Sequence, residues 1–177
     1  MNEAVLPSQF DRVRQELAAN PGGGVLEDVA AQYGLSLLHV VECLPPENSK
    51  RISGEHFVDV MQDIATWGDI TFIVHTKDVI AECHGVLPGG TVGHGFYNLK
   101  GGGCVSGHLR AGNCRAIVFL RRPFMGKDTR SVQFFNGDGA AMFKIYVGRD
   151  ESRQLKPDQV ARFAQLEARF PAVAQGL

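Results

Sequence analysis

The stretch DITFIVH at residues 69–75 decides the fold class, because the chain changes there from helical to β-rich patterning. In this stretch Thr71, Ile73 and His75 are expected to share one face of a strand, since strand side chains alternate. Further β-rich runs, separated by turn-forming residues, are predicted over Val79 to Leu87, Thr91 to Leu99, Ala116 to Leu120, Ser131 to Phe135 and Ala141 to Val147. The connections are too short for parallel crossovers, so we expect an antiparallel sheet.

The residues before and after this β-rich region carry the apolar spacing of helices. Ser8 and Asp11 together predict a capping box for a first helix. Ser36 and Ser53 can cap a third and a fourth helix, and Pro157 suits the first position of the last one. Helices packed beside one antiparallel sheet predict an α+β fold.

Length and composition favour one domain without disulfides. The 177 residues are 44% hydrophobic, which is enough to bury a core. We expect a single domain over residues 1–177, with a helical N-terminal subdomain over 1–46 and an α+β core over 47–177. The 18 basic and 19 acidic residues leave a formal charge of −1, so electrostatics does not favour nucleic acid or membrane surfaces as partners.

The expected compartment is the cytoplasm. Residues 1–7 have neither the basic nor the apolar region of a signal peptide, and no stretch approaches the ~18 apolar residues of a membrane span. Four cysteines without a C-x-x-C pair are typical of reduced thiols: Cys43, Cys83, Cys104 and Cys114. No membrane insertion is expected.

Three other kinds of site are weaker interpretations. Residues 25–44 resemble a helix-turn-helix, but the third helix has no Lys or Arg to contact DNA, so a transcriptional regulator is a second alternative. Ser106 lacks the preceding glycine of a G-x-S-x-G nucleophile elbow. Cys83 and His84 should point to opposite faces of one strand, which argues against a zinc site.

Histidines on strands are candidate ligands of a metal or cofactor. His75 ends the stretch at 69–75, and a later strand is predicted to carry Cys104, Ser106, His108 and Arg110 on one side. A lone strand histidine is most often structural, so these positions alone do not name a cofactor.

Three further features fit a planar iron macrocycle. His94 and Tyr97 place an imidazole and a phenol in one glycine-flanked segment. Large apolar side chains stand at Phe124-Met125 and at Phe134-Phe135. Basic residues that can hold the propionates of haem follow the candidate pocket: Arg110, Arg121, Arg122, Lys127 and Arg130.

Taken together, the motifs resemble the ChuX/HutX family of intracellular haem-utilisation carriers. The resemblance spans nearly the whole chain and includes the helical start from Val29 to Pro45. Five motifs carry it in order: His75 to Val79, His94 to Leu99, Ser106 to Leu109 with Asn113-Cys114, Phe124 to Thr129, and Lys144 to Asp150. Five motifs in the right order are much more specific than any one of them.

The resemblance implies a homodimer whose subunit is a single HemS-like unit, since the larger HemS-type carriers contain two such units in one chain. It implies haem held in the cytosol and delivered to a haem-degrading partner. His75 and His108 match histidines implicated in haem binding, and Tyr97 matches a tyrosine that some members use on the iron. His94 lies in the same segment with a less defined role.

The resulting interpretation is a cytoplasmic haem carrier without covalent chemistry of its own. Tyr97 or His108 is expected to bind the haem iron, with His75 on the opposite side or beside the ligand. A haem-degrading enzyme is the first alternative, and the sequence does not decide between holding haem and degrading it.

Overall fold

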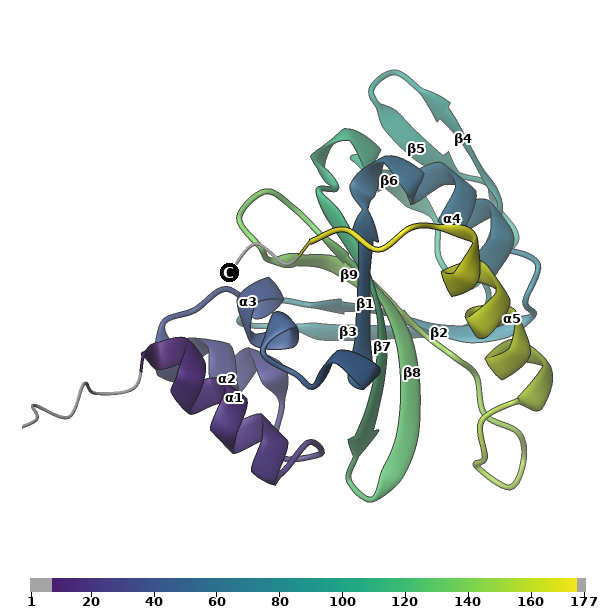
Figure 1. The fold of residues 1–177 in the computed structure, drawn as a ribbon. Coiled ribbons are helices and arrows are strands. Elements are labelled where there is room, and N and C mark those ends of the chain that lie inside the picture. The colour runs from purple at the N-terminus through teal and green to yellow at the C-terminus, as the bar shows by residue number, and fades with distance from the viewer. Residues whose placement is uncertain (1–7, 175–177) are drawn as a thin grey trace, which may run out of the picture.

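The computed structural model describes residues 8–174, which fold as helices on both sides of an antiparallel sheet (Figure 1). The helices are α1 (Gln9–Ala19), α2 (Leu26–Tyr33), α3 (Leu37–Glu42), α4 (Phe57–Ile64) and α5 (Pro157–Arg169). The strands are β1 (Ser49–Ser53), β2 (Asp69–His75), β3 (Ile80–Val86), β4 (Gly90–Gly93), β5 (Phe96–Leu99), β6 (Gly107–Leu109), β7 (Ala116–Phe124), β8 (Lys127–Phe135) and β9 (Ala141–Tyr146). Short 3₁₀ helices lie at Pro46–Asn48, Gly54–His56 and Ala111–Asn113.

Two sheets organise the chain. The large sheet has six strands in the order β1-β7-β8-β9-β2-β3, and the small sheet has three in the order β4-β5-β6. All the pairings between these strands are antiparallel. The predicted α+β class with an antiparallel sheet is therefore confirmed.

The small sheet corrects two predicted strands. The run from Thr91 to Leu99 was expected to be one strand, but it is the hairpin of β4 and β5. His94 and Gly95 form its turn with φ values of 53° and 81°, the left-handed conformation that a two-residue hairpin turn requires. The later strand predicted around His108 is shorter than expected, because only β6 is extended enough to pair with β5.

The predicted helix starts are confirmed with one exception. Ser8 and Asp11 form the capping box of α1, and the Ser36 side chain accepts a hydrogen bond from the backbone N–H of His39 in α3. Pro157 opens α5. Ser53 caps the short 3₁₀ turn that precedes α4, not α4 itself.

Each face of the large sheet carries its own apolar cluster (Figure 1). On one face α4, α5 and the small sheet pack on side chains that include Phe72, Phe134 and Phe143. On the other face α1, α2 and α3 pack mainly on β7 and the end of β8. The helical segment thus shares its core with the sheet, and its predicted boundary as a subdomain at residue 46 stays a prediction.

Gln159 ties α5 to the large sheet. Its amide is fully buried, accepts from the backbone N–H of Gly148 at 2.7 Å, and donates to the carbonyls of Trp67 and Asp69 at 3.1 and 2.9 Å. One side chain therefore satisfies backbone groups from two segments that approach the sheet, where water has little access.

Replacing this amide by an apolar side chain of similar size, Gln159→Leu, should lower the free energy of unfolding by about 2 to 4 kcal/mol, because buried backbone groups would lose their partners. Urea denaturation measures the change. Gln165→Leu, on an exposed position of the same helix, is the matched control. Equal stability of both variants would contradict the anchoring role.

Candidate functional site

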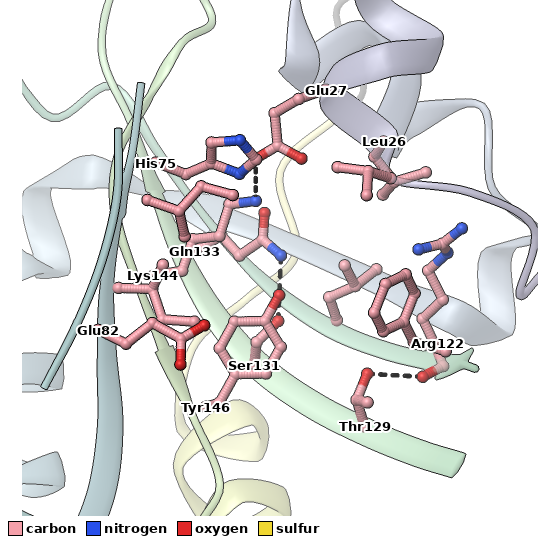
Figure 2. Close-up of a pocket in the computed structure, with 15 residues that line it drawn as sticks. Leu26, Glu27, His75, Glu82, Arg122, Thr129, Ser131, Gln133, Lys144 and Tyr146 are labelled. Atoms are coloured by element: carbon pink, nitrogen blue, oxygen red, sulfur yellow. Dashed lines mark hydrogen bonds and ion pairs between the residues drawn. The ribbon is translucent and has the colours of Figure 1, made fainter. Parts of the chain in front are cut away.

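A pocket lies on the part of the large sheet that α1, α2 and α3 leave uncovered. Its cavity volume is about 180 Å³, and it is open to solvent. We call it the sheet pocket, and its main lining residues are Leu26, Glu27, Ile73, His75, Leu120, Arg122, Phe124, Ser131, Gln133, Lys144 and Tyr146. Figure 2 shows strand side chains forming its floor and the start of α2 forming its upper wall.

Strand alternation accounts for this lining. Ile73 and His75 of β2 point into the sheet pocket, whereas Val74 between them packs against the apolar cluster on the other face. The predicted sharing of one face by Ile73 and His75 is confirmed. On β9, Lys144 and Tyr146 follow the same period.

Glu27 connects α2 to the floor of the pocket. Its Oε1 lies 3.0 Å from Nδ1 of His75, and the same oxygen accepts a hydrogen bond from Nζ of Lys144 (Figure 2). The Lys144 side chain is only 7% exposed. A buried ammonium of this kind needs a counter-charge, and Glu27 provides it.

Arg122 fixes the loop that leads into α2. Its guanidinium donates to the backbone carbonyls of Pro21, Gly23 and Gly24 at 2.7, 2.7 and 2.8 Å. Burial lowers the pKa of Arg122 from its usual value. Its N–H groups are therefore already used in hydrogen bonds to backbone carbonyls. The role of Arg122 in the pocket is to hold this wall in place.

The floor of the pocket is polar at its centre. Nε2 of Gln133 donates to Oγ of Ser131 at 3.1 Å, and the Gln133 Oε1 is a buried acceptor without a hydrogen-bond partner among residues 8–174. Burial, and secondarily the charge of Glu27, raise the pKa of Tyr146, which keeps its hydroxyl neutral and able to donate. A mostly apolar lining with a few polar groups is typical of a site for an organic ligand.

Four of the predicted haem-binding residues, Tyr97 among them, lie on or beside the small sheet, away from this pocket. His108 is exposed, and its Nδ1 lies 2.6 Å from Oδ1 of Asn98. The guanidinium of Arg110 stacks 4.6 Å from the centre of the Phe96 ring. His94 is exposed in the hairpin turn. The small sheet packs on the opposite face of the large sheet, so these residues do not meet His75 within one chain.

Tyr97 is enclosed in the apolar core. Its side chain is fully buried, its ring lies edge-on to Phe57 at 5.7 Å between centres, and it leaves no room for a Cβ atom at Gly90. Its hydroxyl has no partner among the described residues, and burial raises its pKa. Both facts oppose the exposed phenolate that would bind ferric iron.

The predicted propionate-binding cations do not gather at one place. Arg121 and Arg122 are neighbours on β7 and therefore point to opposite faces; Arg121 pairs with Glu167 of α5. Arg130 borders a depression that adjoins the sheet pocket through Ile73 and Tyr146. Lys127 is exposed at the tip of the β7–β8 hairpin, and Arg110 lies on the small sheet.

Sequence reasoning missed four polar residues of the pocket. The alternation of β9 could have placed Lys144 beside Tyr146, since both stand in the quoted motif at 144–150. No motif or spacing near Gln133 or Glu27 indicated that these residues belong to a binding site. Glu27 meets Lys144 across 117 residues of chain, a contact that no short pattern encodes.

The helix-turn-helix interpretation conflicts with the packing of α3. All its residues except His39 are buried, and Glu42 forms an ion pair with Arg51 of β1. A helix packed in this way has no surface to place in a DNA groove. In the part of the chain that the structure describes, no three His, Cys, Asp or Glu side chains group as a metal site, and no helix is long and apolar enough to cross a membrane.

Comparison with known proteins gives three findings. The model of the family "Haem utilisation ChuX/HutX" matches residues 50–166. The intracellular heme transport protein HutX of Vibrio cholerae is 36% identical over 140 residues, which are 78% of this chain and 72% of that protein. A structure of the heme-binding protein ChuX is 45% identical, with a TM-score of 0.81 over 89% of this chain and 97% of that one.

A more distant structure shares the fold alone. The heme-binding protein PhuS of Pseudomonas aeruginosa, in its holo form, is 14% identical with a TM-score of 0.72. The match covers 98% of this chain but 51% of that one, so the present fold corresponds to half of the larger protein.

Replacing Arg122 by methionine should lower the free energy of unfolding by about 2 to 3 kcal/mol, because three backbone carbonyls of the loop before α2 lose a charged donor. Lys127→Met, which removes an exposed cation at the end of the same hairpin, is the control. Thermal and urea unfolding measure both. A variant of Arg122 as stable as the control would show that the loop does not depend on the guanidinium.

Proposed function

The chain belongs to the ChuX/HutX haem-utilisation family, and from this premise we propose that it binds haem as cargo in the cytoplasm and passes it to a haem-degrading partner. The observation that carries the proposal is the sheet pocket. Its lining surface is mostly apolar, it carries polar groups such as Gln133 and Ser131, and it is open to solvent, in a family whose relatives are named for heme transport and heme binding. An open side suits a carrier, since the ligand must leave as well as enter.

A flat ligand fits this pocket better than a compact one. The strands provide an extended surface with Ile73 and Leu120, and Leu26 lies across from them at the start of α2. The adjoining depression, which Arg130 borders, continues this surface. The combined surface is long enough for a macrocycle that carries carboxylates at one edge. Of the predicted cations only Arg122 lines the sheet pocket itself, since Arg130 stands opposite Arg121 in the β7–β8 pair and its guanidinium pairs with Asp128.

The geometry favours His75 as the ligand of the iron, which reverses the ranking from sequence. His75 is the only one of the predicted ligands Tyr97, His108, His94 and His75 that lines the sheet pocket. His108 and His94 remain candidates for a contact made at another surface. Tyr97 would need the small sheet to move before its hydroxyl could reach a ligand.

A second copy of the chain is proposed to cover the edge of the large sheet, giving the predicted homodimer. β3 is an edge strand, and three large apolar residues in or beside it are exposed: Val79 by 58%, Ile80 by 59% and Val86 by 45%. An exposed apolar edge strand readily pairs with another chain. Closed two-fold pairing is the commonest way to cover such a surface.

Titration of the purified protein with hemin should give a saturable Soret band at one haem per subunit. His75→Ala should weaken binding at least about tenfold, because coordination is lost, whereas Tyr97→Phe and His108→Ala should bind as the wild type does. Absence of saturable binding would refute the proposal. Stability of the Soret band with ascorbate distinguishes a carrier from a haem-degrading enzyme, which would bleach it.

Light scattering at micromolar concentration should report about twice the subunit mass of 19.3 kDa. Ile80→Lys, a charge placed on the exposed edge, should shift the protein toward the monomer, because like charges would face each other across the symmetric contact. A wild-type protein of single subunit mass would contradict the dimer and leave haem binding to be judged on its own titration.

A further inference from the structure

We infer that Glu27 is a positioning residue for the iron ligand: its carboxylate holds the imidazole of His75 so that Nε2 is the atom presented to the haem iron. This inference rests on the proposed function and on the choice of His75 as ligand. It assigns a role to a residue of α2, outside the segment 50–166 that the family model matches.

Glu27 is held over the pocket by contacts on three sides. The residue before it, Leu26, is buried in the apolar cluster under the helices. Arg122 holds the carbonyls of the loop that enters α2. Lys144 binds the carboxylate itself from the floor of the pocket. The carboxylate is thus preorganised, and it can orient another side chain without a large cost in side-chain entropy.

A carboxylate at this place determines which nitrogen of His75 is free. An ionised carboxylate only accepts hydrogen bonds, so the nitrogen 3.0 Å away, Nδ1, must carry the proton. In a neutral imidazole the other nitrogen, Nε2, then keeps its lone pair for a metal. Histidine ligands of metals are commonly oriented in this way by a carboxylate, which also raises the basicity of the ligating nitrogen.

Lys144 determines how strongly the Glu27 carboxylate accepts the hydrogen bond from His75. Its ammonium and the His75 N–H share the same carboxylate oxygen, so each weakens that oxygen as an acceptor for the other. His108 provides a contrast inside the same chain. Its Nδ1 faces the amide oxygen of Asn98, whose Nδ2 donates to the carbonyl of Gly93, so its partner is neutral and a weaker acceptor.

Resonance Raman spectroscopy of the ferrous haem complex tests the inference through the iron–histidine stretching band. Glu27→Gln should lower its frequency and weaken hemin binding by about 10- to 100-fold, because a neutral amide accepts less strongly than a carboxylate. Lys144→Met should raise the frequency, because the carboxylate then serves His75 alone. If Glu27 and Lys144 only stabilise the pocket, Glu27→Gln and Lys144→Met should shift the iron–histidine band in the same direction. Asp28→Asn, on an exposed neighbour in the same turn, should leave it unchanged.

The haem-free protein gives a second readout. Nitrogen-15 NMR at mildly alkaline pH should show His75 with the proton on Nδ1, and Glu27→Ala should shift the population toward the form with the proton on Nε2. An unchanged tautomer, or a Raman band that persists in His75→Ala, would overturn the inference while the wild-type Soret titration still upholds haem binding. A wild-type protein that fails to bind hemin would overturn both.

Discussion

The contact of the buried Arg122 guanidinium with three backbone carbonyls is the interaction on which the pocket depends. It joins β7 to a loop about 100 residues earlier in the chain. Removing a guanidinium from water is costly, and three short hydrogen bonds to carbonyls offset that cost. The loop is glycine-rich and has little conformational preference of its own, so without this contact the start of α2 would not have a fixed height above the sheet. Glu27 would then be held over His75 only by the burial of Leu26 and the ion pair with Lys144.

Local physics explains what could be predicted from the sequence. The capping residues Ser8 and Ser36 act within one turn of helix, and the alternation of β2 involves only neighbouring residues, so these features were readable. The turn at His94-Gly95 was missed because Gly93 and Gly95, which favour a turn, were interpreted as the glycines that flank a ligand-binding segment. The α+β class followed from the order of elements, which does not require knowing the strand order.

The candidate site was predicted less well than the fold, for a physical reason. A pocket on a sheet is assembled from residues that are far apart in the chain, as Glu27 and Lys144 are, and such contacts leave no local trace. Residues that are adjacent in sequence can also lie apart in the structure. Arg121 and Arg122 look like one cationic cluster, but neighbouring side chains of a strand point to opposite faces of the sheet. Tyr97 shows a third limit, because an aromatic residue has the same appearance in sequence whether it fills a core or borders a pocket.

The order of the strands in the large sheet also constrains how the protein is made. β1 finds its partner only when β7 has been synthesised, and β2 lies between β3 and the later β9. The first three helices cannot cover their apolar face until β7 and the end of β8 are available. Wall and floor of the sheet pocket therefore come together only after most of the chain has left the ribosome. A chain that stops before β9 lacks Lys144 and Tyr146 of the pocket floor, so ligand capture must wait until that strand has been made.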